Sequence, residues 1–506
     1  MKKILSLVMV LAMVASMLVV GTSAKAGDMD AWDGTADTSW YDPTKTAFEL
    51  STAEQFAGVA ALSAQGVSFE GVTLLLTADL QLNTGDANTW APDVAPANKW
   101  SPIGTKESPF RGVFDGQGHT VSGMYVSYDF ADTTALYKGL FGYVGAEMDY
   151  AVIKNVNLVN SYVHAYRMSG LLAGRIGEMA TVENCRVSGR SYVLEHYPDA
   201  KPGGGNSHSG GAIGIAENAY DVIIDTVSFS GYAQGFVRAG GILGASSGTM
   251  VTLKNCWSDA TVVSSNRTGG IVGQSGAALV EMVNCVFVGH VAHDGKYAKN
   301  YGAIMGGFRA QASSELIITD CYYDCKFTTG AELETAEELP ARIAVTEVGV
   351  MAEGSSWYTP MADASSEATG NDADGCEVEV TKSGDGAKAE FATKLNADIW
   401  DTATLTLKPL TVNEKDISSV TTPETTQAPE TTQAPETTQA PTADTTKAPE
   451  TTKAPDTTKA PDTTKAPDTT KAPDTTEPAG GCGAVIGGGI VVTMAILGTA
   501  WVSKRR

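Results

Sequence analysis

Short apolar stretches alternate with glycine-flanked corners along the middle of the chain, at a nearly constant period. A glycine-flanked apolar step opens each unit, starting at Gly139, Gly170, Gly211, Gly241, Gly270 and Gly302. An Asn-Cys pair or a substitute for it follows in each unit, as Asn155-Val156, Asn184-Cys185, Asp225-Thr226, Asn255-Cys256, Asn284-Cys285 and Asp320-Cys321. A fixed repeat period of this kind is typical of one supersecondary unit that is stacked on copies of itself.

The pattern of each unit predicts short strands joined by sharp turns. Apolar residues alternate between the glycine corners, as at Val251, Leu253 and Cys256, and no helical period of 3.6 residues is present. This pattern predicts an all-β fold, a right-handed parallel β-helix (solenoid); a β-sandwich is the alternative. Glycine is expected where a bend leaves little room for a Cβ, and asparagine where a corner is left-handed and stacked amides can hydrogen-bond along a column.

Four cysteines occupy the same position of different units, namely Cys185, Cys256, Cys285 and Cys321. Side chains in such a column point in parallel, so we expect buried free thiols that act as small hydrophobic groups. Cys325 and Cys376 stand outside this position, and whether they pair is left open.

A short helix is expected before the repeats. Ser51 and Glu54 form a capping box ahead of the apolar positions Phe56 and Leu62, which predicts an amphipathic helix. A β-stack exposes core and unpaired backbone at its end, so we interpret this segment as an N-terminal capping helix.

The composition divides the chain into regions. The predicted regions are a signal peptide at 1–26, a β-helix at 48–325 with its repeats at 139–325, a closing region at 326–415, a disordered Thr/Pro-rich stalk at 417–479, a transmembrane helix at 484–502 and a basic cytoplasmic tail at 503–506. A charged start, an apolar run and small residues indicate export, and an apolar segment followed by basic residues indicates a membrane anchor. The bulk of the chain is therefore expected outside the plasma membrane.

Charge and motif content narrow the function classes. A net charge of −23 and a pI near 4.6 argue against a nucleic-acid partner. The six histidines form no His-Glu-x-x-His motif, no paired cysteines stand at metal spacing, and neither a Gly-x-Ser-x-Gly elbow nor a phosphate loop is present. We therefore expect no catalysis, no cofactor and no metal. A polysaccharide lyase or hydrolase on the flank of the β-helix is the enzymatic alternative.

One insertion interrupts the period. The spacing lengthens between Gly174 and Gly214, and insertions in solenoids emerge as loops on one face, where binding residues often lie. The candidate ligand-binding residues in this stretch are Tyr192, Glu195, His196, Tyr197, Asp199 and His208. A variable surface loop without a ligand is the alternative interpretation.

Several motifs resemble those of bacterial cell-surface proteins with GLUG-motif repeats. They are Trp100-Ser-Pro-Ile-Gly104, the run from Phe110 to Thr120, Gly139-Leu-Phe-Gly142, the glycine and Asn-Cys repeats, and Cys321-Tyr-Tyr-Asp324. The resemblance implies a right-handed β-helix on a Gram-positive-type surface, often in adhesins and sometimes beside the peptidase domain of immunoglobulin A proteases, which is missing here.

Together these features predict a membrane-anchored surface adhesin or carbohydrate-binding protein displayed on a stalk. The expected partner is an extracellular glycan or a surface protein of a host or neighbouring cell. A structural envelope protein is a further alternative.

Overall fold

The computed structural model describes residues 31–128, 136–147, 150–193, 207–293, 300–308, 315–329, 349–351, 358–360, 376–384 and 386–413. The expected signal peptide (1–26), stalk (417–479), apolar segment (484–502) and basic tail (503–506) lie outside these residues. In the part of the chain that is described, no helix is long and apolar enough to cross a membrane.

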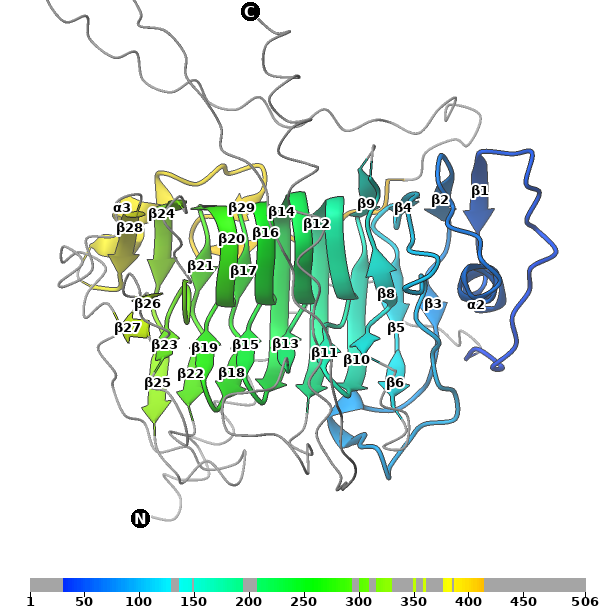
Figure 1. Ribbon diagram of the computed structural model, residues 1–506, viewed down its shortest axis with the longest axis horizontal. Coiled ribbons are helices and arrows are strands. Elements are labelled where there is room, and N and C mark those ends of the chain that lie inside the picture. The colour runs from blue at the N-terminus through cyan, green and yellow to red at the C-terminus, as the bar shows by residue number, and fades with distance from the viewer. Residues whose placement is uncertain are drawn as a thin grey trace, which may run out of the picture. The chain divides into compact units, whose positions relative to one another are not determined.

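The fold is all-β and dominated by parallel pairing (Figure 1). The large parallel sheet contains β1 (Ala47–Leu50), β2 (Thr73–Leu76), β3 (Leu80–Gln81), β4 (Val113–Asp115), β5 (Thr120–Ser122), β6 (Tyr125–Ser127), β8 (Phe141–Val144), β9 (Ala151–Lys154), β10 (Asn157–Ala165), β12 (Ala173–Val193), β14 (Ile213–Gly235), β16 (Leu243–Lys254), β17 (Trp257–Ser258), β18 (Thr261–Ser264), β20 (Val272–Val283), β21 (Val286–Phe287), β22 (His290–His293), β24 (Glu315–Tyr323), β25 (Lys326–Thr329) and β28 (Cys376–Lys382).

A second parallel sheet contains β7 (Tyr137–Lys138), β11 (Met168–Ser169), β13 (His208–Gly210), β15 (Arg238–Gly240), β19 (Arg267–Gly269) and β23 (Asn300–Gly302). The two antiparallel pairs are β26 (Gly349–Met351) with β27 (Tyr358–Pro360), and β29 (Trp400–Asp401) with β30 (Thr406–Leu407). The helices are α2 (Ala53–Ala64), the 3₁₀ turn η1 (Ala87–Thr89) and α3 (Ala387–Ala392).

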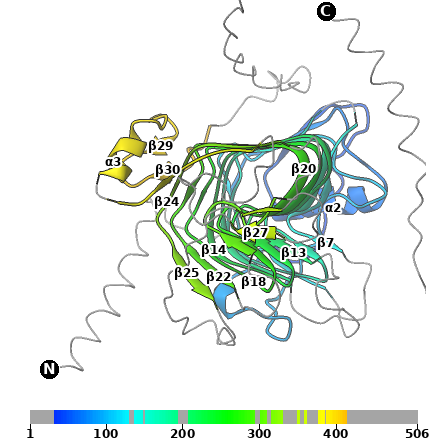
Figure 2. The same cartoon turned by 60° about the vertical axis from the view of Figure 1, so that its left-hand side comes forward.

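Each passage of the chain pairs in register with the next repeat, so that successive repeats lie side by side along one axis (Figures 1 and 2). We call one such passage a coil. One inward column of register partners consists of Ile153, Val182, Ile224, Leu253, Met282 and Ile318, and all of them are fully buried. Full burial of one such side chain contributes about 1.5–3 kcal/mol, so the columns form a continuous core.

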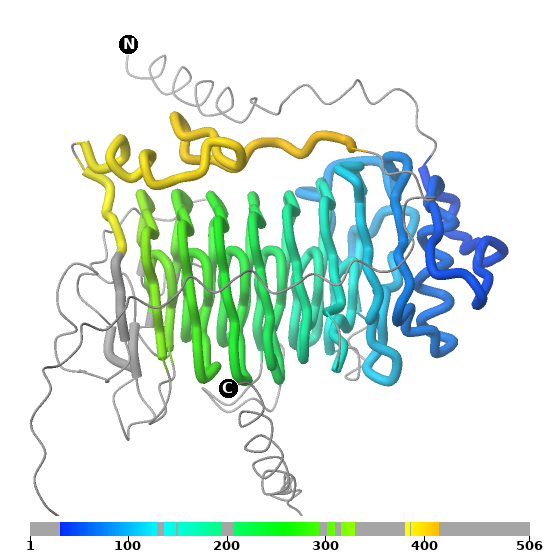
Figure 3. The backbone as a smooth tube through the Cα atoms, turned by 90° about the horizontal axis from the view of Figure 1, so that it is seen from above, coloured from blue at the N-terminus to red at the C-terminus, as the bar shows by residue number. Residues whose placement is uncertain are grey.

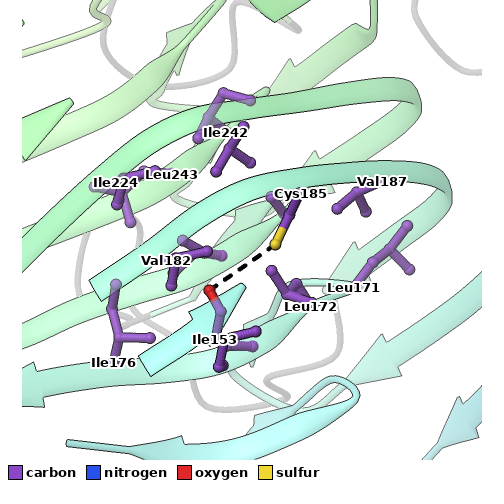
Figure 4. Packing of buried hydrophobic residues seen from close by; sticks show 14 of the residues in the cluster. Ile153, Leu171, Leu172, Ile176, Val182, Cys185, Val187, Ile224, Ile242 and Leu243 are labelled. Atoms are coloured by element: carbon purple, nitrogen blue, oxygen red, sulfur yellow. Dashed lines mark hydrogen bonds between the residues drawn. The ribbon is translucent and has the colours of Figure 1, made fainter. Parts of the chain in front are cut away.

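The cysteine column lies inside this core, and its thiols behave as expected. Cys185, Cys256, Cys285 and Cys321 are buried and free. The Cys185 Sγ donates to the carbonyl of Ile153 in the preceding coil at 4.0 Å (Figure 4). Burial raises the pKa of the Cys185 thiol to about 12, which keeps it protonated and unreactive. The side chain of Cys376 lies outside the described part.

The corner residues have the predicted conformations. Asn155, Asn184, Asn255 and Asn284 have φ between 50° and 55°. The Asn184 Nδ2 donates to the Asn155 Oδ1 at 2.7 Å, 29 residues earlier in the chain, and Asn284 donates to Asn255 at 3.3 Å. At the opposite corner, a Cβ on Gly241 would collide with the carbonyl oxygen of Gly270 in the next coil, which explains the glycine steps.

The predicted alignment of the third repeat was wrong by one residue. Cys185 pairs with Val227, and Asp225 pairs with Lys254, so the Asn-Cys position is occupied by Thr226-Val227 and not by Asp225-Thr226. Thr226 takes the left-handed corner with φ 57°. Asp225 still supplies the oxygen of the ladder, because its Oδ1 accepts from the Asn255 Nδ2 at 3.0 Å.

The N-terminal helix forms, but its predicted cap was wrong. The N-cap is Thr52, whose side chain accepts from the Gln55 backbone N–H, and the Gln55 side chain accepts from the Ser51 backbone N–H. Ser51 and Glu54 therefore do not form the box. Helix α2 follows β1, which pairs with β2, and its Phe56 stacks on Trp100 and Phe114 in the core.

Residues 386–413, which we call the C-terminal strap, run back along the outside of the coils (Figures 2 and 3). Phe391 stacks on Tyr322 with ring centroids 5.2 Å apart. A second apolar cluster joins the strap to the coils and contains Val286, Tyr322, Phe391, Leu395, Trp400, Leu405 and Leu407. The strap ends beside β4, where the Asn413 backbone N–H donates to the Gln117 carbonyl at 3.0 Å. The end of the predicted closing region thus lies along the flank of the stack.

Candidate functional site

The predicted ligand loop is only partly within the described residues. Tyr192 and His208 are described, whereas Glu195, His196, Tyr197 and Asp199 lie outside the described residues. Tyr192 belongs to β12 and His208 to β13. Their strands meet at a corner where the Ser191 and Ser209 hydroxyls are 3.0 Å apart.

Tyr192 belongs to a column of aromatic rings on the outer face of β6, β10, β12 and β14, which we call the tyrosine ladder. Tyr125 and Tyr162 are stacked at 5.3 Å, Tyr162 and Tyr192 lie 5.6 Å apart, and Tyr192 and Tyr232 lie 5.2 Å apart. The Arg190 guanidinium lies 4.8 Å from the centre of the Tyr192 ring. Burial raises the pKa of the Tyr192 hydroxyl, so this group is neutral and can donate a hydrogen bond.

The end of the ladder is the part that solvent reaches. Tyr192 is only 8% exposed, while Tyr232 and Arg190 are half-buried. The Tyr232 hydroxyl donates to the Gln234 Oε1 at 3.0 Å. The Arg190 guanidinium donates to the Tyr192 hydroxyl at 2.5 Å and to the Asn88 carbonyl at 2.7 Å. The described surface here therefore offers the edge of an aromatic ring, the remaining N–H groups of this guanidinium and the amide of Gln234.

His208 is not a surface group. It is 2% exposed, and the guanidinium of Arg238 lies 2.9 Å from its Nε2. Burial and the neighbouring Arg238 hold the pKa of His208 well below its usual range. His208 is therefore neutral at pH 7 and packs between coils.

A polar cavity that the sequence analysis did not predict lies between the Asn corners and the strap. It has a volume of about 270 Å³. Its walls on the coils are Gln117, Asn155, Asn184, Arg186 and Thr226, and its walls on the strap are Asp398, Ile399, Lys408, Pro409, Leu410, Thr411 and Asn413. We call it the strap cavity.

Arg186 fixes the strap over this cavity. Its Nε and one NH2 hydrogen donate to the Lys408 carbonyl at 2.9 and 2.7 Å, and its other terminal nitrogen donates to the carbonyls of Thr226 and Cys185 at 2.9 and 3.2 Å. Burial lowers the pKa of the Arg186 guanidinium to about 10, so it remains a cation at pH 7. Its charge is compensated by carbonyl dipoles.

The amide ladder is interrupted at the cavity. Asp115 accepts from Asn155 at 2.8 Å, and Asn155 accepts from Asn184. The next coil has Thr226 at the corner, and the Thr226 hydroxyl donates to Asp225 at 2.8 Å instead of to Asn184. The Asn184 carbonyl oxygen therefore ends the first ladder at the cavity wall.

The stacking of the coils also brings acidic and basic side chains together, as a polysaccharide lyase or hydrolase would require. Lys154 lies 4.0 Å from Glu183 of the next coil, and Lys254 lies 3.8 Å from Glu281. Glu183 and Asp225 are register partners, but Glu183 is engaged by Lys154 and Asp225 by Asn255 and Thr226. Each of these two ion pairs joins two neighbouring coils. Among the residues described, no group of three or more His, Cys, Asp or Glu side chains could hold a metal ion.

The one signal in the sequence that could have pointed to the strap cavity is the irregular third repeat. The Asp225-Thr226 departure marks the coil at which the ladder breaks, and Arg186 follows a corner cysteine directly. The strap side of the cavity had no such signal, because nothing in the spacing of residues 386–413 indicates which face they cover.

Comparison with known proteins gives one partial similarity. The chain is 29% identical to halomucin from Haloquadratum walsbyi over 189 residues, which is 37% of this chain and 2% of halomucin. The chain thus spans about one fiftieth of the length of the curated relative that it matches. No family profile matches the chain, and no solved structure does.

Proposed function

We propose that this chain is an exported, surface-displayed glycan-binding adhesin without catalytic activity, built as a right-handed parallel β-helix of the GLUG-repeat type. The parallel coils in register support the β-helix. Export and display rest on the predicted signal peptide, stalk and membrane anchor, and the partial similarity to halomucin is in keeping with them. The partner is an extracellular glycan or a glycosylated protein on a host or neighbouring cell.

The observation that carries the glycan-binding proposal is the half-buried end of the tyrosine ladder, which solvent reaches. Tyr232, Arg190 and Gln234 present an aromatic edge, a cation and an amide on adjacent strands. Binding sites combine aromatic surface with a few oriented polar groups, and tyrosine offers both in one side chain. The register column of Tyr232 continues through the half-buried Thr261 and His290 of the next two coils, so the surface extends along one axis and suits a chain-like ligand.

The test is a glycan array probed with the full-length chain, in parallel with a reducing-sugar assay on the glycans that bind. We expect binding without release of reducing ends. Tyr232→Ala should abolish binding, while Tyr220→Ala, which removes a tyrosine that is 65% exposed and outside the ladder, should retain it. Release of sugar would establish the polysaccharide lyase or hydrolase instead. The absence of both binding and release would favour a structural envelope protein.

A further inference from the structure

We propose that the strap cavity is a binding site for a small, neutral, polyhydroxylated molecule, such as a single sugar ring or a polyol. This site is separate from the half-buried end of the tyrosine ladder, and its ligand differs in size from the extended glycan proposed there. The Asn corners of the coils form one side of the cavity, and the strap forms the other.

The size of the cavity limits the ligand. Its volume of about 270 Å³ corresponds to roughly nine waters at liquid density, and it lies below the ~300 Å³ at which pockets for drug-sized ligands begin. A single sugar ring fits this space, whereas most of an extended oligosaccharide would lie outside it.

The chemistry of the walls selects hydroxyl groups. The Asn184 Oδ1 and the Asp398 carboxylate are acceptors, and the fifth N–H of Arg186 is a donor beyond the four that bind carbonyls. A hydroxyl is at once a donor and an acceptor, so neighbouring hydroxyls of one molecule can satisfy both kinds of wall group. Ile399 and Leu410 supply apolar surface for the C–H face of a ring.

The charges of the walls disfavour ions. An anion would meet the Asp398 carboxylate. A cation would meet the Arg186 guanidinium, which remains charged at pH 7, and Lys408, whose ammonium donates to the Ala397 carbonyl at 2.6 Å. A neutral polar molecule avoids both repulsions and loses less hydration on entry.

A ligand in this position would join the strap to the coils. Asp398 and Asn413 come from the strap, while Asn184 and Arg186 come from the coils. Occupancy should therefore stabilise the docked strap by mass action. The amide of Asn413, which donates to the Gln117 carbonyl, reports on that docking.

The experiment titrates the full-length chain with free glucose, galactose, mannose, N-acetylglucosamine and glycerol by calorimetry, and follows hydrogen exchange of the Asn413 amide. We expect at least one of these probes to give a saturable heat and to slow exchange at Asn413. Asp398→Asn should weaken binding about tenfold, because a charge-assisted hydrogen bond becomes a neutral one. Glu390→Gln, the same kind of change elsewhere on the strap, should leave binding unchanged.

Four outcomes would overturn the inference. If no probe saturates, the cavity holds water only. If Asp398→Asn binds as well as the unaltered chain, or if Tyr232→Ala abolishes binding of the free sugar, the ligand lies elsewhere. If the sugar binds but Asn413 exchange is unchanged, the ligand does not bridge the strap and the coils. Asp398→Asn is also tested on the glycan array. Weaker array binding would show that the cavity takes the terminal sugar of a glycan, whereas unchanged array binding would show that it takes a free sugar or polyol.

Discussion

The corner at position 226 shows how strongly one backbone conformation is imposed by its neighbours. Thr226 has φ 57°, a left-handed conformation that is unfavourable for a β-branched residue and is taken by asparagine in the coils on both sides. Register with the flanking coils fixes this conformation. Cys185 pairs with Val227, and the pairs Asp225–Lys254 and Ser228–Trp257 on either side place Cys256 opposite Val227. The chain thus keeps the corner geometry while losing the amide that would continue the ladder.

Thr226→Asn should stabilise the protein by about 1 kcal/mol. Asparagine tolerates the left-handed region better than threonine, and its Nδ2 could donate to the Asn184 carbonyl oxygen and continue the ladder. The measurement is the free energy of unfolding in urea. Thr261→Asn, at an ordinary strand position in β18, is the control and should give no gain. A Thr226→Asn protein no more stable than the original would contradict the strain argument.

At the scale of elements, the sequence predicted the repeated corners and the N-terminal helix, but it did not predict the strap. The glycine and asparagine corners were predictable because each answers a local steric requirement that recurs in every coil. The strap was not predictable, because Trp400, Leu405 and Leu407 show only that some apolar surface is covered. Their place against Val286 and Tyr322 depends on contacts with residues far away in the chain.

The candidate site was predicted less well, and for a similar reason. The insertion pointed to Tyr192, which the structure places in the tyrosine ladder, and to His208, which is buried against Arg238. The strand β12 continues through residue 193, so Tyr192 belongs to a regular column and not to the inserted loop. Sequence spacing cannot distinguish the end of a strand from the start of a loop when both carry aromatic residues.

Arg186→Ala should release the part of the strap around Lys408 while leaving the coils intact. The guanidinium provides two hydrogen bonds to the Lys408 carbonyl, and hydrogen bonds of charged groups contribute about 1.5–3 kcal/mol each before solvent screening. Hydrogen exchange at the Asn413 amide should accelerate by about tenfold or more, whereas exchange in β16 should not change.

Arg186→Lys provides the matched comparison for this prediction. Lysine keeps the charge, but a single ammonium cannot reach the carbonyls of Lys408, Thr226 and Cys185 with the same planar geometry. Its exchange rates should lie near those of Arg186→Ala. If Arg186→Lys behaved like the unaltered protein, charge alone would hold the strap and the geometric role of the guanidinium would be wrong.

At the scale of the whole molecule, the register of the coils places two histidines in the packed interior of the stack. His164 is fully buried beside Tyr128, with the ring centres 4.9 Å apart, and burial lowers the pKa of His164 to about 4. The pKa of His208 is also held well below its usual range. An acidic chain of net charge −23 thus carries neutral imidazoles inside its stack at pH 7.

The stability of the whole molecule should therefore fall between about pH 6.5 and pH 4. The unfolded chain binds protons on these histidines below about pH 6.5, whereas folded His164 stays neutral until about pH 4, so acidification favours unfolding. The pKa difference at His164 alone corresponds to about 3 kcal/mol once the pH is below both values.

Urea unfolding at about pH 7 and about pH 4.5 measures this loss. His164→Phe keeps a ring against Tyr128 but has no proton to bind, so its loss over the same range should be smaller by about 2–3 kcal/mol. The exposed carboxylates with lowered pKa, Asp33, Asp37, Asp42 and Asp401, titrate below this range and affect both proteins equally. Equal losses in the two proteins would show that His164 can bind a proton while the stack stays folded.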